Sequence, residues 1–304
     1  MKPKKVQISG KEICFLCNSD SMYLSRDRRS ITFHQRHWYY KCRECKAYSL
    51  FPKLKSEEIK DLYSKEYIED VNPNFDLNEQ VTVSRFSNLL RELKRVENPT
   101  DQTFLDYGCG ATAEVVILAS DLGFRAFGVE VEEGTRLEAE QKSNCKIFLP
   151  DTVFASGKNF DIIFLGDVLE HLCDPLDVLE QLGALLGPGG LFIIQGPLEG
   201  AVTISNALLS VKARMLSKSP SNFPPYHVSL ATRAAIAKAL EINGLAIERL
   251  VVTEPLWPAP KFGSKASFHS LAAVVFSLAK IVDIFISKLL PYFGTRFFLI
   301  ATKK

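Results

Sequence analysis

Short apolar runs alternate with amphipathic stretches from about residue 101 to the end of the chain. Between most of these runs, apolar residues recur at helical spacing. Strands that alternate with helices along a chain favour a parallel sheet with helices on both faces. The pattern therefore predicts an α/β domain over residues 101–304. Its predicted strands lie near 103–107, 125–130, 146–149, 160–165, 190–196, 246–253 and 295–302.

A different pattern precedes this domain, over residues 56–100. Ser56 is suited to cap a helix at 56–67, in which apolar residues have helical spacing. Apolar residues recur in the same way over 83–96. We expect these two helices to form a connector between an N-terminal module and the α/β domain.

The N-terminal module contains two C-x-x-C pairs. Two thiolates on a tight turn are typical ligands of a structural zinc ion, and a module this small has too little core to fold without one. The pattern predicts a zinc-ribbon-like module over residues 1–55, with four buried, metal-free thiols as the alternative. His34 and His37 lie between the pairs, although four cysteines already complete a tetrahedral set. The predicted ligands of Zn²⁺ are Cys14, Cys17, Cys42 and Cys45.

Charge is uneven along the chain. Residues 1–65 hold 15 Lys or Arg against 7 Asp or Glu, a surplus of eight positive charges. Since the whole chain carries +2, the remainder carries a formal charge of −6. A basic region fits a solvated face or RNA, but zinc with four thiolates adds −2 and weakens the second interpretation. We expect no nucleic-acid partner, and an RNA-modifying enzyme or RNA-binding module is the alternative.

The segment 266–290 raises the question of a membrane. Its longest stretch without Asp, Glu, Lys or Arg runs over 266–279, which is 14 residues, whereas a transmembrane helix needs about 20. Apolar positions at helical spacing, with Lys280 and Lys288 elsewhere, predict one amphipathic helix. We expect it to pack over the sheet edge, to form a dimer contact or to lie on a membrane surface.

The chain starts with the polar and basic sequence MKPKKVQISG, which lacks the apolar run of a signal peptide. The cytoplasm is therefore the expected location. Membrane association through the 266–290 helix is the alternative.

The stretch 103–119 runs from an apolar strand through a glycine turn into a helix. Gly108 and Gly110 let the backbone turn sharply and approach a ligand closely. Asp106, two residues before the first glycine, disfavours an anionic pyrophosphate and suits a cationic ligand. Glu130 ends the next predicted strand, at a position from which an acid reaches ribose hydroxyls. These residues predict a site for a cationic ligand that carries a ribose.

Five segments occur in a fixed order: LDYGCG with Asp106, VE with Glu130, LPD with Asp151, FDIIFLGDVLEHLCDP and LGPGGLFII. In this order they resemble the class I S-adenosylmethionine-dependent methyltransferases, over residues 101–304. The resemblance implies a Rossmann-like seven-stranded sheet whose last strand is antiparallel. It also implies a glycine loop at the methionine part of S-adenosylmethionine, Glu130 at the ribose and Asp151 at the adenine amino group. Ala111 and Thr112 depart from the family's frequent GCGxG form, so we expect a tighter loop.

The segment 167–171 follows the fourth predicted strand, at the carboxyl edge where open α/β sheets bind ligands. Asp167 and Glu170 have the spacing of a helix-capping pair, and we also expect Asp167 to line the cofactor pocket. His171 is a candidate general base because histidine titrates near neutral pH. His227 precedes a predicted helix, and in related enzymes a histidine there often faces the substrate. Either histidine has the alternative of bracing the backbone.

These patterns together predict a methyltransferase that acts on a small molecule. The zinc module before the domain resembles that of bacterial enzymes in sugar, surface-polysaccharide or secondary-metabolite pathways, so these are the expected acceptors. A hydroxyl or carbon acid needs a base for its proton, whereas a neutral amine does not. A scaffold without turnover is a further alternative, but Asp106, Glu130 and Asp151 together argue against it.

Overall fold

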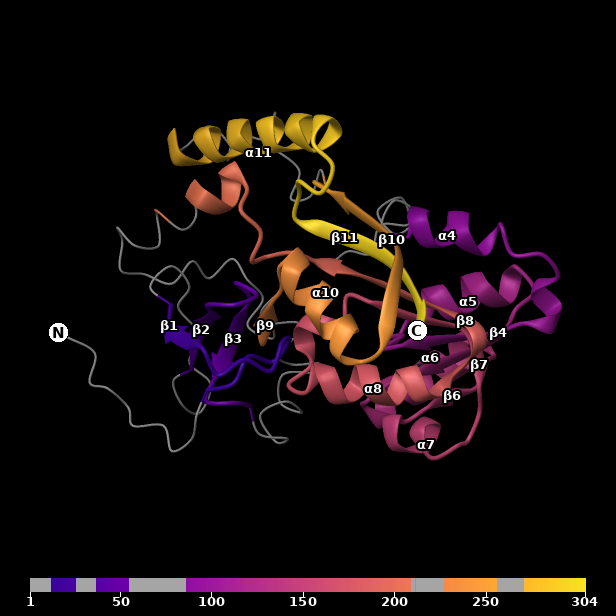
Figure 1. The fold of residues 1–304 in the computed structure, drawn as a ribbon. Helices are drawn as coiled ribbons and strands as arrows, with labels where there is room; N and C mark the ends of the chain where they lie inside the picture. The colour runs from indigo at the N-terminus through magenta and orange to yellow at the C-terminus, as the bar shows by residue number, and fades with distance from the viewer. Residues whose placement is uncertain (1–11, 26–36, 55–85, 209–210, 212–226, 256–270) are drawn as a thin grey trace.

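The computed structural model describes residues 12–25, 37–54, 86–208, 211, 227–255 and 271–304. Within them the chain forms a large sheet of seven strands, beside which lies a smaller four-stranded sheet (Figure 1). The large sheet has the order β10-β11-β8-β7-β4-β5-β6. Its strands are β4 (Thr103–Tyr107), β5 (Arg125–Val129), β6 (Ile147–Phe148), β7 (Phe160–Gly166), β8 (Leu186–Pro197), β10 (Leu245–Thr253) and β11 (Arg296–Lys303).

Strand direction follows the prediction. β4 is parallel to β5 and β7, and the outer pairs β5–β6 and β7–β8 are parallel as well. The last strand, β11, inserts antiparallel between β8 and β10. All seven predicted strands are present, but β8 starts earlier than expected, at Leu186, which pairs with Phe160 across a register shift. The expected Rossmann-like sheet is therefore confirmed.

Helices cover both faces of this sheet, as the alternating pattern predicted. One face packs against α8 and α10, and its core includes Leu105 and Phe192. The opposite face packs against α4, α5 and α6 around Phe104 and Phe164. The helices are α4 (Ser87–Leu93), α5 (Glu114–Asp121), α6 (Glu133–Ser143), α7 (Pro150–Phe154), α8 (Pro175–Leu185), α10 (Arg233–Ile242) and α11 (Leu271–Leu289), with 3₁₀ turns η1 (Pro99–Asp101) and η2 (Leu169–His171).

The smaller sheet joins the N-terminal module to the α/β domain. It has the antiparallel order β1-β2-β3-β9, in which β1 (Met22–Leu24), β2 (Trp38–Cys42) and β3 (Tyr48–Phe51) come from the N-terminal module. The fourth strand, β9 (Ser229–Leu230), comes from the α/β domain, and Leu230 pairs with Tyr48. The hydroxyl of Thr232, at the start of α10, also donates to the carbonyl of Cys45 at 2.6 Å. The cysteine module and the segment after residue 226 therefore form one unit.

Some predicted features fall partly or wholly outside the described ranges. The helix expected at 56–67 and the alternative ligand His34 lie outside them. The helix expected at 83–96 is described from residue 86 and is α4. The amphipathic helix expected at 266–290 is α11, described from Leu271. None of the helices in the described ranges is long and apolar enough to span a membrane.

Candidate active site

The glycine loop lies where β4 and β5 end. Gly108 and Gly110 both have left-handed backbone angles, with φ of +85° and +63°. A Cβ at Gly108 would lie 2.5 Å from a methyl carbon of Val168, so a side chain there would displace the segment after β7. A Cβ at Gly110 would meet nothing within 4 Å, which leaves open space beside that turn. The loop fits a ligand that approaches the backbone closely.

Two buried carboxylates flank the loop. Glu130 Oε2 accepts the Gly110 N–H at 3.0 Å, and its Oε1 accepts the Val131 N–H at 2.8 Å. Burial raises the pKa of Glu130, while these N–H groups oppose the rise. Asp106 is only 4% exposed. The negative charge at this place suits a cationic ligand, and the structure brings Asp106, Gly108, Gly110 and Glu130 together as predicted.

Asp151 lies at the same edge, exposed in the first turn of α7. Its carboxylate acts on Tyr107: burial raises the pKa of Tyr107 to about 12, and the charges of Glu130 and Asp151 add to the rise. Tyr107 therefore lies near both acids. The sequence identified Tyr107 only as a strand residue, because nothing in the local pattern separates a site tyrosine from a core tyrosine.

Asp167 has a different partner from the one its spacing suggested. The 3₁₀ turn η2 has no side-chain cap, so the predicted capping pair of Asp167 and Glu170 is wrong. Asp167 instead adopts a left-handed φ of 56°, and its carboxylate forms an ion pair with Arg296 of β11. It directly precedes Val168, the residue that packs against Gly108. Asp167 therefore lies close to the glycine loop.

The two candidate histidines meet at one place. The rings of His171 and His227 lie edge to face with centroids 4.8 Å apart, and His171 Nε2 is 3.9 Å from a Glu170 oxygen. Glu199, which follows β8, lies 2.8 Å from His227 Nδ1. The main chain of Val228 donates to the Glu170 carbonyl at 2.8 Å. A cluster of two imidazoles and two carboxylates results.

Electrostatics in this cluster favour protons near neutral pH. Burial raises the pKa of Glu170 to about 7, an effect that the charge of His227 opposes. Burial lowers the pKa of His227, but Glu199, Glu170 and Asp167 outweigh burial, so the net shift is upward. Sequence reasoning missed Glu199, because only the tertiary fold brings the segment after β8 to the segment before β9.

The four cysteines converge as predicted. Cys14 Sγ lies 3.5 Å from Cys45 Sγ, and Cys17 Sγ lies 3.6 Å from Cys42 Sγ. All four sulfur atoms lie within 4.8 Å of one another. A tetrahedral zinc ion with bonds of about 2.3 Å needs sulfur–sulfur distances of about 3.8 Å. The four residues therefore fit a zinc ion.

The thiol contacts themselves also favour a cation. The hydrogen bond from Cys45 lowers the pKa of Cys14 to about 5, whereas burial raises the pKa of Cys17 to about 12. Thiols that bind a metal ion lose their protons to it, so a divalent ion would favour the ionised form of all four. His37 is buried beside this module but interacts with the Pro52 carbonyl through Nδ1 at 2.8 Å, so it braces the backbone.

Comparison with known proteins agrees with this geometry. The family model described as "Methyltransferase domain" matches residues 78–250. The chain is similar to the ubiquinone biosynthesis O-methyltransferase of Ruegeria pomeroyi, with 33% identity over 29% of this chain and 38% of that protein. For the same enzyme of Dinoroseobacter shibae the identity is 34%, over 34% of this chain and 44% of that protein. The chain thus matches about two fifths of the length of these curated relatives.

Solved structures show the same fold. The geranyl diphosphate C-methyltransferase of Streptomyces coelicolor superposes with a TM-score of 0.51 and 12% identity, over 83% of this chain and 89% of that chain. A chain from the complex between the Haloferax volcanii Trm112 methyltransferase activator and a methyltransferase superposes with a TM-score of 0.50 and 14% identity. That match covers 82% of this chain and 98% of the other. At such identity the likeness concerns the fold alone.

Proposed function

The chain belongs to the class I S-adenosylmethionine-dependent methyltransferases, and from this premise we propose that it methylates a hydroxyl oxygen of a small molecule. The observation that carries the proposal is the cluster of Glu170, His171, His227 and Glu199, in which Glu170 and His227 are buried. A hydroxyl acceptor must lose its proton as it attacks, and this cluster is built to hold one. The names of the curated relatives also support transfer to oxygen.

The cofactor side of the site has a defined set of residues. S-adenosylmethionine supplies an electrophilic methyl group on a positively charged sulfur. The open turn at Gly108 and Gly110 would receive its methionine part, Glu130 its ribose hydroxyls and Asp151 its adenine amino group. The buried charge of Asp106 favours the cationic sulfur side. In this proposal Asp167, fixed by Arg296, lines the same pocket.

On the acceptor side, His227 is the proposed base and His171 its neighbour. Glu199 holds the Nδ1 side of His227 at 2.8 Å, which orients the ring and stabilises the imidazolium that forms when Nε2 takes a proton. His171 is part of η2, and Val228, the residue after His227, donates its N–H to the carbonyl of Glu170 in the same turn. These backbone contacts hold the two histidines in a fixed orientation. The protein's main contribution is to align the hydroxyl with the methyl carbon.

We propose that the zinc ion is structural and that the module it stabilises also holds the segment on the acceptor side. Cys45 accepts a hydrogen bond from Thr232, and the Tyr39 hydroxyl donates to the carbonyl of His227. β3 also pairs with β9 directly after His227. We assign the module the role of holding this segment in place.

Helix α11 supports a further proposal, that the protein lies on an anionic membrane surface. Two of its charged residues face inward: Lys280 pairs with buried Glu254, and Asp283 accepts the N–H groups of Ile204 and Ser205 at 2.9 and 2.8 Å. Its outward face is apolar. The exposed residues are Val275, Leu278, Ile281, Val282, Phe285 and Leu289.

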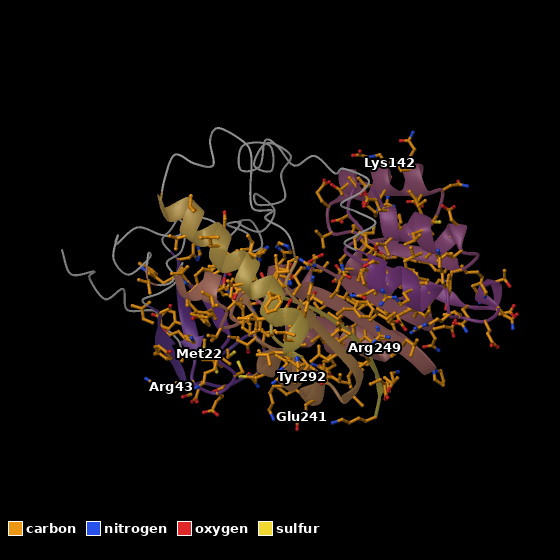
Figure 2. The ribbon with its side chains drawn as sticks, turned by 90° about the horizontal axis from the view of Figure 1, so that it is seen from above. Met22, Arg43, Lys142, Glu241, Arg249 and Tyr292 are labelled. Atoms are coloured by element: carbon orange, nitrogen blue, oxygen red, sulfur yellow. The ribbon has the colours of Figure 1, made fainter. Side chains whose placement is uncertain are left out.

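The charge beside this apolar face favours anionic lipid over a second copy of the chain. In the part of α11 whose side chains the structure describes, Lys288 is the exposed charged residue. Arg233 lies over the ring of Tyr292, 4.6 Å from its centroid, just beyond the helix end. Figure 2, seen from above, shows α11 crossing the near side of the molecule, with Tyr292 beyond one end of the helix. Apolar, basic and aromatic residues in this arrangement are typical of interfacial helices.

The acceptor is proposed to be a sugar, a polysaccharide precursor or a secondary metabolite with a free hydroxyl. Purified protein would be incubated with methyl-labelled S-adenosylmethionine and fractions of small-molecule extract, with an RNA fraction in parallel. Label in a small-molecule fraction supports the proposal. Label in RNA alone, or tight binding of NAD in place of S-adenosylmethionine, contradicts it.

A further inference from the structure

One carboxylate and two imidazoles form a compact buried group near the carboxyl edge of the sheet. Glu170, His171 and His227 each offer one ligand atom, and these atoms all lie within 4.8 Å of one another. Glu170 is 5% exposed and His227 is 8% exposed. Imidazole and carboxylate groups at this spacing are common ligands of divalent transition metals.

The backbone already holds this group together. Val228 donates its N–H to the carbonyl of Glu170 at 2.8 Å, so the segment that carries His227 is fixed against η2. From the small sheet, Tyr39 donates its hydroxyl to the carbonyl of His227. The two imidazole rings meet at 75° with centroids 4.8 Å apart. Ligands held in place before binding lose little freedom when the ion enters, which favours affinity.

His227 also has the outer partner that metal-bound histidines normally have. Its Nδ1 lies 2.9 and 2.8 Å from the two oxygens of Glu199. A neutral ring that donates from Nδ1 carries its lone pair on Nε2, which is then the ligating nitrogen. The Glu199 carboxylate adds a second negative charge beside this group. A cation would balance this charge.

We infer that Glu170, His171 and His227 bind one divalent transition-metal ion, separate from the zinc of the four cysteines. Two nitrogen ligands and one oxygen ligand favour an ion of the Mn²⁺ or Zn²⁺ class over Mg²⁺ and Ca²⁺, which prefer oxygen ligands. Three protein ligands leave coordination positions for a substrate. The metal site itself does not depend on the proposed function. Its consequence, that the acceptor hydroxyl coordinates this ion, rests on that function.

The chemistry of such a step balances without a further reactant. A metal-bound hydroxyl has a lowered pKa and releases its proton to solvent. Its oxygen then bonds to the methyl carbon, and the carbon–sulfur bond breaks with its electron pair returning to sulfur. The sulfonium becomes a neutral thioether. When the ion is bound, His171 and His227 are its ligands, and the cation acts on the acceptor hydroxyl in place of His227 as base.

Mn²⁺ is the probe, because a site of four thiolates retains zinc in preference to this harder ion. The full chain with its cysteine-bound zinc is titrated with Mn²⁺, and the electron paramagnetic resonance signal of free Mn²⁺ is followed. We expect one Mn²⁺ per chain. Glu170→Gln, His227→Gln and Glu199→Gln should each weaken binding by about 10- to 100-fold. The control Glu241→Gln, at an exposed pair on α10, should bind like the parent.

Thermal unfolding would confirm that each variant is folded. If Glu170→Gln does not fold, Glu199→Gln tests the same site. No Mn²⁺ binding by the parent, or unchanged affinity in these folded variants, would overturn the inference. The proposed function has a separate readout: Mn²⁺ binding without turnover of any hydroxyl acceptor would contradict the function and leave the site standing. Turnover of a hydroxyl acceptor by a protein that binds no Mn²⁺ would support the proposed function and overturn the metal site.

Discussion

At the residue scale, cofactor affinity should depend most strongly on Glu130. Glu130→Gln keeps the shape of the side chain but removes the charge that would hold the ribose hydroxyls. Loss of charge-assisted hydrogen bonds should cost about 2 kcal/mol, roughly 30-fold in affinity for S-adenosylmethionine. Isothermal calorimetry measures the change. Glu138→Gln, at a half-buried residue of α6 paired with Lys142, is the control and should bind normally; a folded Glu130→Gln that does the same contradicts the assignment.

His227 is the residue on which turnover should depend. His227→Gln should lower kcat by about 10² to 10⁴-fold and leave cofactor affinity nearly unchanged, because the group acts only when the acceptor attacks. Steady-state kinetics with an identified acceptor, together with calorimetry, separates the two quantities. His171→Asn should have a smaller effect. Normal rates in both variants would exclude both histidines and point to an amine acceptor.

The site residues that local sequence could predict are those fixed by the strand–loop–helix unit. Asp106, Gly108 and Glu130 follow from it, since parallel strands bring their carboxyl ends to one edge. Glu199 and Arg296 could not be predicted, because their partners lie far away in sequence. The capping interpretation of Asp167 failed for the same reason: its ion pair with Arg296 and left-handed backbone depend on a strand that the local pattern does not include.

At the scale of elements, the cysteine module should control the segment that carries His227. One zinc per chain is expected, and Cys42→Ser should release it and loosen the small sheet, because the module has little else to hold it. Since β9 pairs with β3, hydrogen exchange should also rise at residues 227–230. Metal analysis and hydrogen-exchange mass spectrometry measure both effects.

Cys145→Ser is the matched control for this prediction. Cys145 is partly buried, lies outside the four-cysteine group and packs against the opposite core. It should retain zinc and normal exchange in the small sheet. A zinc-free chain whose module is fully folded would refute the structural role of the ion.

The exposed face of α11 gives a second prediction at this scale. Leu278→Ser and Phe285→Ser should each reduce binding to phosphatidylglycerol vesicles by about 10-fold, since each removes about 1.5 kcal/mol or more of apolar burial. Both residues are more than half exposed, so the fold should tolerate the changes. Leu137→Ser, at an equally exposed leucine of α6, is the control in a co-sedimentation assay. A stable dimer that these changes dissociate, without vesicle binding, would contradict the membrane proposal.

Strong periodicity explains why most elements were predictable. The strands of the large sheet are apolar runs of ordinary length, and α11 has a clear helical repeat. β9 was not predictable, because it has two residues and exists only through its pairing with β3. The burial of Lys280 and Asp283 on α11 could not be predicted from local sequence either, because it depends on Glu254 and on two N–H groups that satisfy these side chains.

On the scale of the whole molecule, the fold places two kinds of chemistry at one edge of the large sheet. The ends of β4 and β5 supply the glycine loop and the acids of the proposed cofactor side. The segments after β7 and β8 supply Glu170 and Glu199, and the segment before β9 supplies His227. The small sheet connects the last of these to the cysteines (Figure 1). Cofactor binding, acceptor positioning and metal content are therefore expected to be linked in one unit.

The central claim is methyl transfer from S-adenosylmethionine to oxygen. It is tested most directly by incubating the full chain with ¹³C-methyl-labelled cofactor and a small-molecule extract, and recording the ¹³C spectrum of the products. The account predicts a new methoxy resonance that is formed by the parent and strongly reduced with His227→Gln. A new resonance in the N-methyl or C-methyl range alone, or no labelled product while S-adenosylmethionine is bound, would contradict it.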